Sequence, residues 1–596
     1  MKRILILSLS ALCAAACSLD RAPLDRESMD TFYKDENQLQ AATSYFYSAL
    51  LPSGDDIYKF EDADLYFSCS SLSDLQLGGK NRKTPTSDKL WEWNTLRYIN
   101  ETLENMGHCS DEVVRNKYTG ITYFFRAYFY YLKLRRYGEV PWYDHSLLTD
   151  DPDLYRPRDS RDFIVGKIFE DLDNAIRMLP DNKEKYKITK WDAMLIKSRV
   201  ALFEGTWHKY HTESQYEKDA NYYLKIAAEV SKEFIESSPY HIYNTGNPDT
   251  DYQHLFSTGE TEDEEVVLGK NFAIDLFVSH FAARSTFGDR TTAINKKFVD
   301  MFLKADGTRF TDDSGWDKKE FYDQMTGRDP RLAQIVRSPG YHLIDSDQIM
   351  PPSFSNSLTG YNCCKYAVSA TKVGPGEAWS GEDGDLPVWR AAEVYLNYAE
   401  AQAERTDYVI TQDDIDLSIK PLRDRAGMPN LNLAYANANP DNAYLGSAKY
   451  GYTNVTGDNK GVILEIRRER AVELAQELDF RWWDLMRWKA GNCMLQDLSG
   501  IYFPGYGEYD LDHDGTLDLC IYNGAEPTTT ATSLLKVGSG QAVEFSEGTS
   551  GNIVPYPSRV KRRSFDEERD YLFPLPLGDL EVNHGLTQNP GWDIPK

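Results

Sequence analysis

The segment DLDHDGTLD, residues 510–518, has carboxylates at the spacing of a calcium-binding loop. In such a loop, oxygens come from positions 1, 3, 5 and 9, a glycine allows the sharp turn at position 6, and position 7 offers its backbone carbonyl. Position 12 is Ile521 instead of a bidentate glutamate, so water or another residue would complete the coordination shell. We expect a structural calcium ion here, with an acidic surface turn as the alternative. The predicted ligands are Asp510, Asp512, Asp514, Thr516 and Asp518.

Aromatic side chains in polar loops form a second set, with the chemistry of sugar recognition. Sugars present apolar C–H faces that stack on tryptophan and tyrosine rings, and their hydroxyl groups hydrogen-bond to amides, carboxylates and guanidinium groups. The segment GGKNRKTPTSDKLWEWN, residues 78–94, combines both kinds of residue. The alternative is that each aromatic residue belongs to the core, because tryptophan is highly buried on average. The candidate binding residues are Trp91 and Trp93 first, then Arg82, Asn94, Tyr361 and Trp379.

Catalytic patterns are absent from the sequence. It contains no GxSxG, no glycine-rich phosphate loop and no HExxH, and with 93 acidic residues any pair of carboxylates could be proposed as an acid and a base. His208 and His211 have the spacing of metal ligands without an obvious third partner, so we expect surface histidines. Glu469, Glu473 and Arg481 are expected to be scaffold charges on a helix. We therefore expect neither an enzyme nor a catalytic cofactor.

The segment LCAAACSLDRAPLD, residues 12–25, places a cysteine where a hydrophobic leader ends. Lys2 and Arg3 precede an apolar run that is too short to span a bilayer, and three alanines follow it. The cysteine after these alanines is similar to the lipobox of a bacterial lipoprotein. We therefore expect residues 1–16 to be a lipoprotein signal peptide and Cys17 to be acylated; the alternative is an ordinary signal peptide with an incidental cysteine.

The elements that must position these residues are mainly helices. In residues 113–141, apolar and aromatic side chains recur every three or four positions until Gly138 and Pro141 end the pattern. Similar stretches follow in residues 163–179, 195–202 and 223–234, with short breaks between them. Helix pairs that repeat in this way, with large aromatics against alanines, are typical of tetratricopeptide-like stacking.

The rest of the chain alternates between loops and further helices. Residues 240–385 are rich in Gly, Asp, Ser and Thr, and helical patterns resume in residues 388–404 and 413–429 and again from Gly461. Residues 430–460 and 491–570 are again loop-like. We predict a mainly α fold, with a tetratricopeptide-like scaffold, long loop-rich insertions and little β structure.

Composition excludes some functions. The formal net charge is −27, so binding to a nucleic-acid backbone is not expected. After residue 16, no uninterrupted apolar stretch is long enough to cross a membrane. Six cysteines remain besides Cys13 and Cys17, without a CxxC pair, and we expect them to be mostly buried thiols.

Six segments carry a resemblance that extends over the whole mature chain. They are CSLDRAPLD (17–25), FFRAYFYYLKLRRYGEVP (124–141), VWRAAEVYLNYAEAQAE (388–404), LRDRAGMP (422–429), ILEIRRERAVELAQELDFRWWDLMRWKAG (463–491) and LFPLPLGDLEVNHGLTQNPGW (572–592). Together they resemble the SusD family, also called RagB/SusD, of Bacteroidetes outer-membrane lipoproteins. The resemblance implies one unit over residues 17–596, with about four tetratricopeptide-like helix pairs: N-terminal repeats in 17–239, and a loop-rich half with the remaining repeats in 240–596.

The resemblance also implies a function. Such a protein would be anchored in the outer membrane at the cell surface and would sit as a substrate-binding lid over a TonB-dependent transporter of the SusC type. We therefore expect a non-catalytic lipoprotein that captures an oligosaccharide and delivers it to that transporter. Two alternatives remain open: a glycoside hydrolase, and a tetratricopeptide-type scaffold that binds peptides or proteins.

Overall fold

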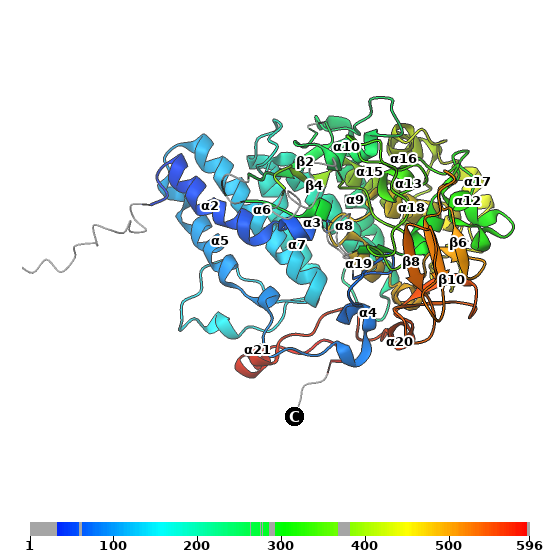
Figure 1. Ribbon diagram of the computed structural model, residues 1–596. Helices are drawn as coiled ribbons and strands as arrows, with labels where there is room; N and C mark the ends of the chain where they lie inside the picture. Colours follow the sequence, from blue (N-terminus) through cyan, green and yellow to red (C-terminus); the bar gives the residue numbers. More distant parts are fainter. Residues whose placement is uncertain are drawn as a thin grey trace, which may run out of the picture.

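The computed structural model describes residues 32–58, 62–262, 264–273, 276, 278–284, 292–367 and 382–592 (Figure 1). Cys17 and Trp379, both named above as candidate residues, lie outside this part of the chain. Within it, no helix is long and apolar enough to cross a membrane.

The longest predicted helix forms where its periodicity indicates. Helix α6 (Glu112–Tyr137) begins after Asp111, whose side chain accepts hydrogen bonds from the backbone of Val113 and Val114, and it ends at Gly138, where φ is +76°. The predicted apolar face points into the core, with Tyr118, Ile121, Phe125 and Tyr128 buried. The other helices of this half are α2 (Glu36–Leu50), α3 (Gly54–Tyr58), α4 (Asp74–Leu77), α5 (Asn94–Asn105), α7 (Arg161–Met178), α8 (Lys190–Tyr210) and α9 (Ala220–Ser237).

Consecutive helices pack in pairs, α6 on α7 and α8 on α9, and the later pair α15 and α16 repeats this arrangement. Helix α15 also packs on α8 and α9, so the second half of the chain extends the helical scaffold of the first. Its helices are α10 (Asp251–Ser257), α11 (Lys296–Met301), α12 (Phe321–Met325), α13 (Arg331–Ile335), α15 (Ala391–Glu404), α16 (Gln412–Arg425), α17 (Leu433–Ala438), α18 (Lys460–Glu473), α19 (Phe480–Arg487), α20 (Pro557–Val560) and α21 (Leu577–Val582).

The β structure consists of small sheets. Two pairs, β1 with β3 and β2 with β4, join distant segments, and two three-stranded sheets have the orders β5-β10-β9 and β6-β7-β8. Strands β7 and β8 run parallel, and the other pairs are antiparallel. The prediction of a mainly α fold with long insertions and little β structure is confirmed. The strands are β1 (Tyr66–Ser68), β2 (Val266–Lys270), β3 (Thr292–Ile294), β4 (Leu386–Arg390), β5 (Tyr502–Phe503), β6 (Gly507–Tyr509), β7 (Leu519–Tyr522), β8 (Ser533–Lys536), β9 (Val543–Phe545) and β10 (Gly551–Pro555).

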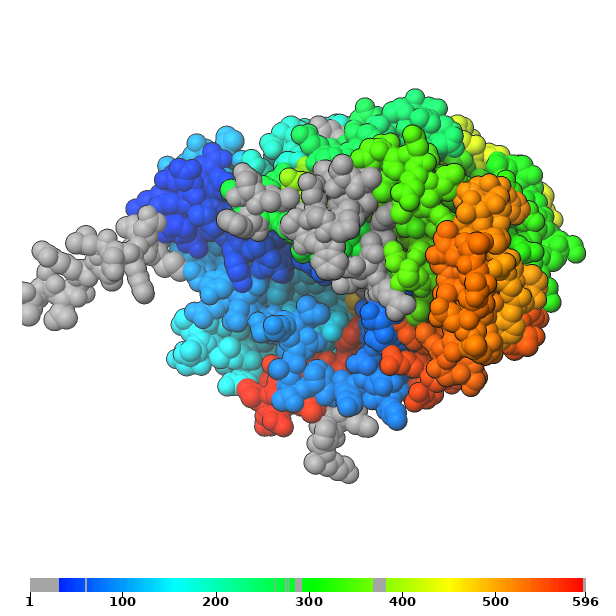
Figure 2. Space-filling view, viewed as in Figure 1, coloured from blue at the N-terminus to red at the C-terminus, as the bar shows by residue number. Residues whose placement is uncertain are grey.

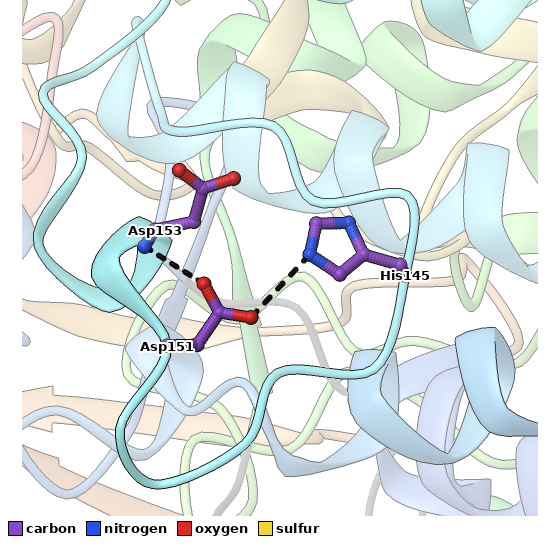
Figure 3. A group of neighbouring side chains, drawn as sticks. All are labelled: His145, Asp151 and Asp153. Carbon is purple, nitrogen blue, oxygen red and sulfur yellow. Dashed lines mark hydrogen bonds and ion pairs between the residues drawn. The ribbon is translucent and has the colours of Figure 1, made fainter.

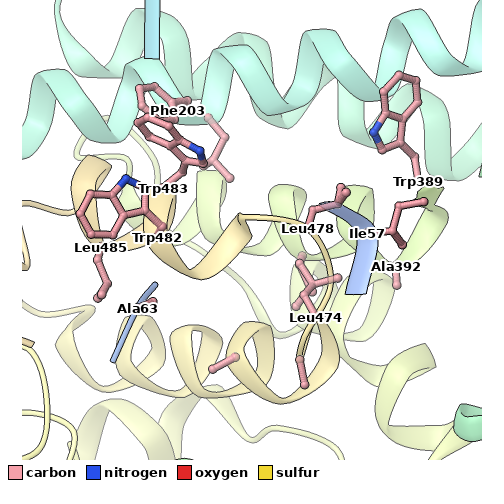
Figure 4. Packing of buried hydrophobic residues seen from close by; sticks show 14 of the residues in the cluster. Ile57, Ala63, Phe203, Trp389, Ala392, Leu474, Leu478, Trp482, Trp483 and Leu485 are labelled. Atoms are coloured by element: carbon pink, nitrogen blue, oxygen red, sulfur yellow. The ribbon is translucent and has the colours of Figure 1, made fainter. Parts of the chain in front are cut away.

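Large aromatic side chains fill the core between the helices. Trp482 and Trp483 of α19 lie close to Phe203 of α8, and the ring centroids of Trp483 and Phe203 are 6.3 Å apart (Figure 4). Trp389 is also buried, at the end of β4 next to α15. Such rings bury more apolar area than any other side chain, so they account for much of the packing between distant segments.

Helix α18 carries charges into the interior. Glu469 pairs with Arg331 at 2.6 Å and with Arg423 at 2.8 Å, and Glu473 pairs with Arg425 at 2.5 Å. Arg481 of α19 forms a buried ion pair with a distant aspartate, Asp64, at 2.7 Å. These charges hold helices and loops together, as expected for scaffold residues.

The prediction that His208 and His211 lie on the surface was wrong. His208 and His211 are buried, because α8 packs against its neighbours along its whole length. The His211 ring stacks on Trp207 with centroids 3.8 Å apart, and its Nε2 lies 2.8 Å from the carbonyl of Met486. The cysteines at 69, 109, 363, 364, 493 and 520 are buried, as predicted.

The C-terminal segment returns to the N-terminal half. The backbone amide of Phe573 donates to the carbonyl of Arg136 at 2.8 Å, and that of Leu577 donates to the carbonyl of Pro85 at 2.9 Å. Figure 2 shows the described part of the C-terminal segment, in red, against the blue residues of the N-terminal half at one end of the molecule. This end of the molecule contains the cavity described next.

Candidate ligand-binding site

A cavity of about 460 Å³ opens where the C-terminal segment packs on the N-terminal half. Its walls come from the short 3₁₀ helix η2 (Lys89–Trp91), the start of α5, the loop of residues 141–155 and α21. The volume is in the range of small-molecule binding sites. The lining includes three residues predicted from the sequence, Trp91, Trp93 and Asn94, together with Asn100, Tyr143, His145, Tyr155, Asp579 and Asn583.

The loop that carries Trp91 and Trp93 is hydrogen-bonded to side chains of α6. Asp88 starts η2 by accepting a hydrogen bond from the backbone of Leu90, and it also accepts one from the hydroxyl group of Tyr137 at 2.8 Å. The ammonium group of Lys133 donates to the carbonyls of Leu90 and Glu92 at 2.5 and 2.8 Å. Burial lowers the pKa of Lys133 to about 7. The backbone of the tryptophan loop is therefore fixed on the helix.

The two tryptophans differ in what they expose. Trp91 is 3% exposed and packs on Tyr137, with ring centroids 4.8 Å apart. Trp93 is half-buried, with the ring of Tyr143 5.6 Å from its own and the ammonium nitrogen of Lys133 5.1 Å from its centroid. Trp93 thus has ring surface left for a ligand, whereas Trp91 mainly supports the wall.

Polar groups lie beside the aromatic wall. Asn94 is exposed at the start of α5, and Asp579 of α21 faces the same cavity. Burial raises the pKa of Asp579, partly offset by Lys133. The side chain of Asn100 is already occupied, because its amide donates to the carbonyls of Tyr143 and His145, both at 3.1 Å.

The rim of the cavity is apolar and exposed. Leu148, Tyr155 and Val582 are 65%, 56% and 67% exposed. Sequence reasoning missed Tyr155, although the segment DDPDLYRPRD, residues 150–159, shows the same signal as residues 78–94: an aromatic ring among charged residues and prolines. Asp579 had no such signal, because only the return of the C-terminal segment brings it to the cavity.

Two predicted binding residues lie elsewhere. Tyr361 is fully buried and donates to the side-chain oxygen of Gln324 at 2.6 Å, so it is a core residue. Arg82 is 8% exposed and forms an ion pair with Asp570 at 3.0 Å, and it borders a different cavity, of about 660 Å³. Burial lowers the pKa of Arg82 to about 10. Its guanidinium group faces Trp592, 5.2 Å from the ring centroid, so it helps to hold the C-terminal segment.

The loop of residues 144–155 brings two aspartates, Asp151 and Asp153, close to His145, which lines the cavity. Figure 3 shows the imidazole ring of His145 facing the carboxylate of Asp151, with Asp153 next to it. The Asp144 carboxylate lies 3.1 Å from Nδ1 of His145, and this hydrogen bond raises the pKa of the imidazole.

The acidic loop of residues 510–518 connects β6 to β7, away from the cavity. Asp510, Asp512 and Asp514 each bring one oxygen within 4.8 Å of the others, but Asp518 is not part of this group. Asp518 instead accepts from the backbone of Leu511 at 2.7 Å, and burial raises its pKa to about 6. The backbone amide of Thr516 donates to Asp514 at 2.7 Å, and Gly515 has the left-handed φ of +89° that the turn requires.

The described residues form a mainly helical protein with a cavity between its C-terminal segment and its N-terminal half. Residues 224–592 match the model of the SusD family, and residues 55–202 match a family described as starch-binding and associating with the outer membrane. The chain belongs to the SusD family.

Known relatives agree with this assignment. A SusD-like protein of Bacteroides ovatus is 25% identical over 292 residues, a match that spans 45% of this chain and about half of that protein. Two crystal structures from Bacteroides fragilis have the same fold: a SusD-like protein (22% identity, TM-score 0.66, covering 96% of this chain and 100% of that one) and a SusD-like carbohydrate-binding protein (20% identity, TM-score 0.68, covering 94% and 100%).

Proposed function

We propose that this protein is a non-catalytic glycan-binding lipoprotein that captures an oligosaccharide at the cell surface and delivers it to a SusC-like TonB-dependent outer-membrane transporter. The observation that carries the proposal is the cavity, in which half-buried Trp93 and exposed Tyr155 stand beside Asn94 and Asp579. Aromatic rings offer stacking surfaces to a sugar, and the amide and the carboxyl group offer hydrogen bonds.

The comparisons support a carbohydrate as the ligand class. One matched family is described as starch-binding and associating with the outer membrane. A laminarin-binding SusD-like protein shares the fold, with 16% identity and a TM-score of 0.53. Attachment through an acylated Cys17 would keep the protein at the membrane in which the transporter lies.

A glycan array followed by calorimetry tests the binding proposal. With a glycan identified on the array, Tyr155→Ala and Trp93→Ala should each weaken affinity about thirtyfold, because an aromatic anchor is worth about 2 kcal/mol. Tyr435→Ala is the matched control, since Tyr435 is 62% exposed on α17, outside the cavity. Unchanged affinity in both cavity variants would remove the site. Release of new reducing ends from the glycan would favour a glycoside hydrolase, and capture of peptides instead of glycans would favour a protein-binding scaffold.

We also propose that calcium binds at the acidic loop. Asp512 is 8% exposed, and within the described part of the chain its Oδ2 has no hydrogen-bond partner. A buried carboxylate oxygen without a partner is costly, and a cation shared with Asp510 and Asp514 would remove this cost. Of the predicted ligands, Thr516 would contribute its carbonyl, and Asp518 would support the loop through Leu511.

Melting curves test the calcium proposal. Millimolar calcium should raise the melting temperature relative to chelator, because a ligand that binds only the folded state stabilises it. Asp512→Ala should abolish this shift, whereas Asp306→Asn, in an exposed acidic turn elsewhere, should leave it intact. An equal shift in Asp512→Ala would mean that the loop is an acidic turn and no more.

A further inference from the structure

Three metal-ligating side chains converge in the loop that forms one wall of the cavity (Figure 3). One ligand atom from each of His145, Asp151 and Asp153 lies within 4.8 Å of the other two. Nε2 of His145 and Oδ2 of Asp151 are 3.7 Å apart, which is too far for a hydrogen bond. Two ligands of one tetrahedral zinc ion stand about 3.3 Å apart, so this spacing needs little change to accept an ion. We infer that His145, Asp151 and Asp153 bind a divalent transition-metal ion of the zinc type at the cavity.

The imidazole ring of His145 is oriented for this role. Its Nδ1 lies 3.1 Å from the carboxylate of Asp144, which favours the tautomer with a proton on Nδ1. The other nitrogen, Nε2, then presents its lone pair toward Asp151. A carboxylate behind the histidine is the usual arrangement around protein-bound zinc, where it fixes the ring and raises its basicity.

The two sides of the loop are held in place without an ion. On one side, Asn100 is 1% exposed and donates to the carbonyl of His145 at 3.1 Å. On the other, Oδ1 of Asp151 accepts from the backbone of Asp153 at 2.9 Å and starts the 3₁₀ helix η4 (Pro152–Tyr155). This bond leaves Oδ2 of Asp151 for the ion. Ligands that are positioned in advance lose less entropy when they bind.

The ligand types select the metal. One imidazole nitrogen with two carboxylates suits zinc and its transition-metal neighbours, whereas calcium prefers an all-oxygen shell such as the loop of residues 510–518. Among the described residues, the site also has excess negative charge from Asp144, Asp151 and Asp153. Nη1 of Arg156 lies 4.0 Å from Asp153, and Arg126 acts on Asp144 but is already paired with Asp171. A divalent ion would compensate this charge.

A bound ion would join the two sides of the loop that carries Leu148 and Tyr155, and so fix one wall of the cavity. On the proposed function, glycan affinity should therefore rise in the presence of zinc. This second step rests on the proposed function, and the metal site itself does not.

Calorimetric titration of the full mature protein with zinc chloride, in detergent and with calcium in excess, tests the metal site. The excess calcium occupies the oxygen-only loop and does not compete for the imidazole. Wild type should take up zinc with an affinity that His145→Ala lowers at least tenfold. Asp150→Asn, in the same loop but outside the cluster, should bind zinc as wild type does. Cobalt should give visible absorption bands in wild type and in Asp150→Asn, and His145→Ala should lose them.

Two outcomes would overturn the metal site: no zinc uptake by wild type, or equal zinc affinity in His145→Ala and wild type. Titration of the glycan with and without zinc is read separately. If zinc binds and glycan affinity stays the same, the metal site stands and its role in the cavity is refuted. If no glycan binds at all, the proposed function fails while the zinc titration still decides the metal site.

Discussion

Trp91 and Trp93 stand two positions apart in the sequence, yet their side chains have different surroundings. Trp91 lies against Tyr137 of α6 and is almost fully buried, whereas Trp93 keeps part of its ring at the cavity. Tyr155 is exposed at the rim. The three residues should therefore respond differently to truncation.

Replacing Trp91 should mainly lower the stability of the folded state, and it should have less effect on contacts with a ligand. Trp91→Ala removes a buried ring and should lower the free energy of unfolding by about 3–5 kcal/mol. Tyr155→Ala should leave the unfolding midpoint within experimental error. Urea unfolding of both variants checks the prediction, and a Trp91→Ala midpoint equal to that of wild type would contradict it.

Asp192 should make stability depend on pH. It is fully buried at the start of α8 and accepts hydrogen bonds from the backbone and the hydroxyl group of Thr189, both at 2.8 Å. Burial raises its pKa from 3.8 to about 7. The folded state therefore holds this proton more tightly than the unfolded state, and the stability it provides is lost as pH rises from about 4 to about 7.

The variant Asp192→Asn isolates this effect. The asparagine side chain can still accept hydrogen bonds from Thr189 through its amide oxygen, but it does not ionise. The loss of unfolding free energy between about pH 4 and pH 7 should therefore be smaller in the variant by on the order of 4 kcal/mol. Unfolding free energies of wild type and variant, measured across this pH range, give the difference. Parallel curves for the two proteins would show that Asp192 does not titrate as described.

For single residues, the sequence predicts which residue types could bind a sugar, but it does not predict which of these residues are exposed. Trp93 and Asn94 do line the cavity. Arg82 and Tyr361 do not, because Asp570 and Gln324, distant in the sequence, pair with them. The exposure of a side chain depends on the residues that pack against it in the fold, and a local sequence pattern does not include these residues.

Among the elements, α18 shows how a helix can be buried while carrying many charges. From Gly461 to Glu473 it is buried throughout, and its carboxylates meet arginines from several other segments. Burial alone would raise the pKa of Glu473, but Arg425, Arg390 and Arg331 lower it to about 2. Helix α18 therefore connects several segments of the scaffold through buried ion pairs.

Removing one partner of this network should be costly. Glu473→Ala removes one carboxylate that three buried arginines share, Arg331, Arg390 and Arg425. The buried network then has an excess of positive charge, and the free energy of unfolding should fall by about 3–5 kcal/mol. Glu229→Ala on α9 breaks an exposed pair with Lys225, where both side chains are more than half exposed, and should cost less than about 1 kcal/mol. Denaturant midpoints compare the two, and equal shifts would show that the burial of the network adds nothing.

Element types were predictable where one periodicity dominates. Helix α6 follows its apolar spacing from Asp111 to Gly138. The strands were not located, because most are three to five residues long and pair with partners far along the chain, as β2 does with β4. Such short segments form in response to their neighbours, and their own sequences carry little signal.

For the whole molecule, the proposed acylation of Cys17 predicts the cell fraction in which the protein is found. Cys17→Ala should move the protein from the membrane fraction to the soluble fraction in cells that lack the partner transporter, because acyl chains would be its remaining anchor. Ser28→Ala is the control and should stay with the membranes. Continued membrane association of Cys17→Ala in these cells would refute lipidation as the anchor.

The return of the C-terminal segment has a consequence for the order of folding. The hydrogen bond from Arg82 to the carbonyl of Asp570 closes a loop of 488 positions. Closing a flexible loop of that length costs on the order of 5 kcal/mol in chain entropy, and contacts between distant residues form slowly. Because α21 forms one wall of the cavity, the cavity cannot be complete until this late segment of the chain has been synthesised and has docked. Any contact that the proposed ligand makes with this wall must therefore come after α21 has docked on the N-terminal half.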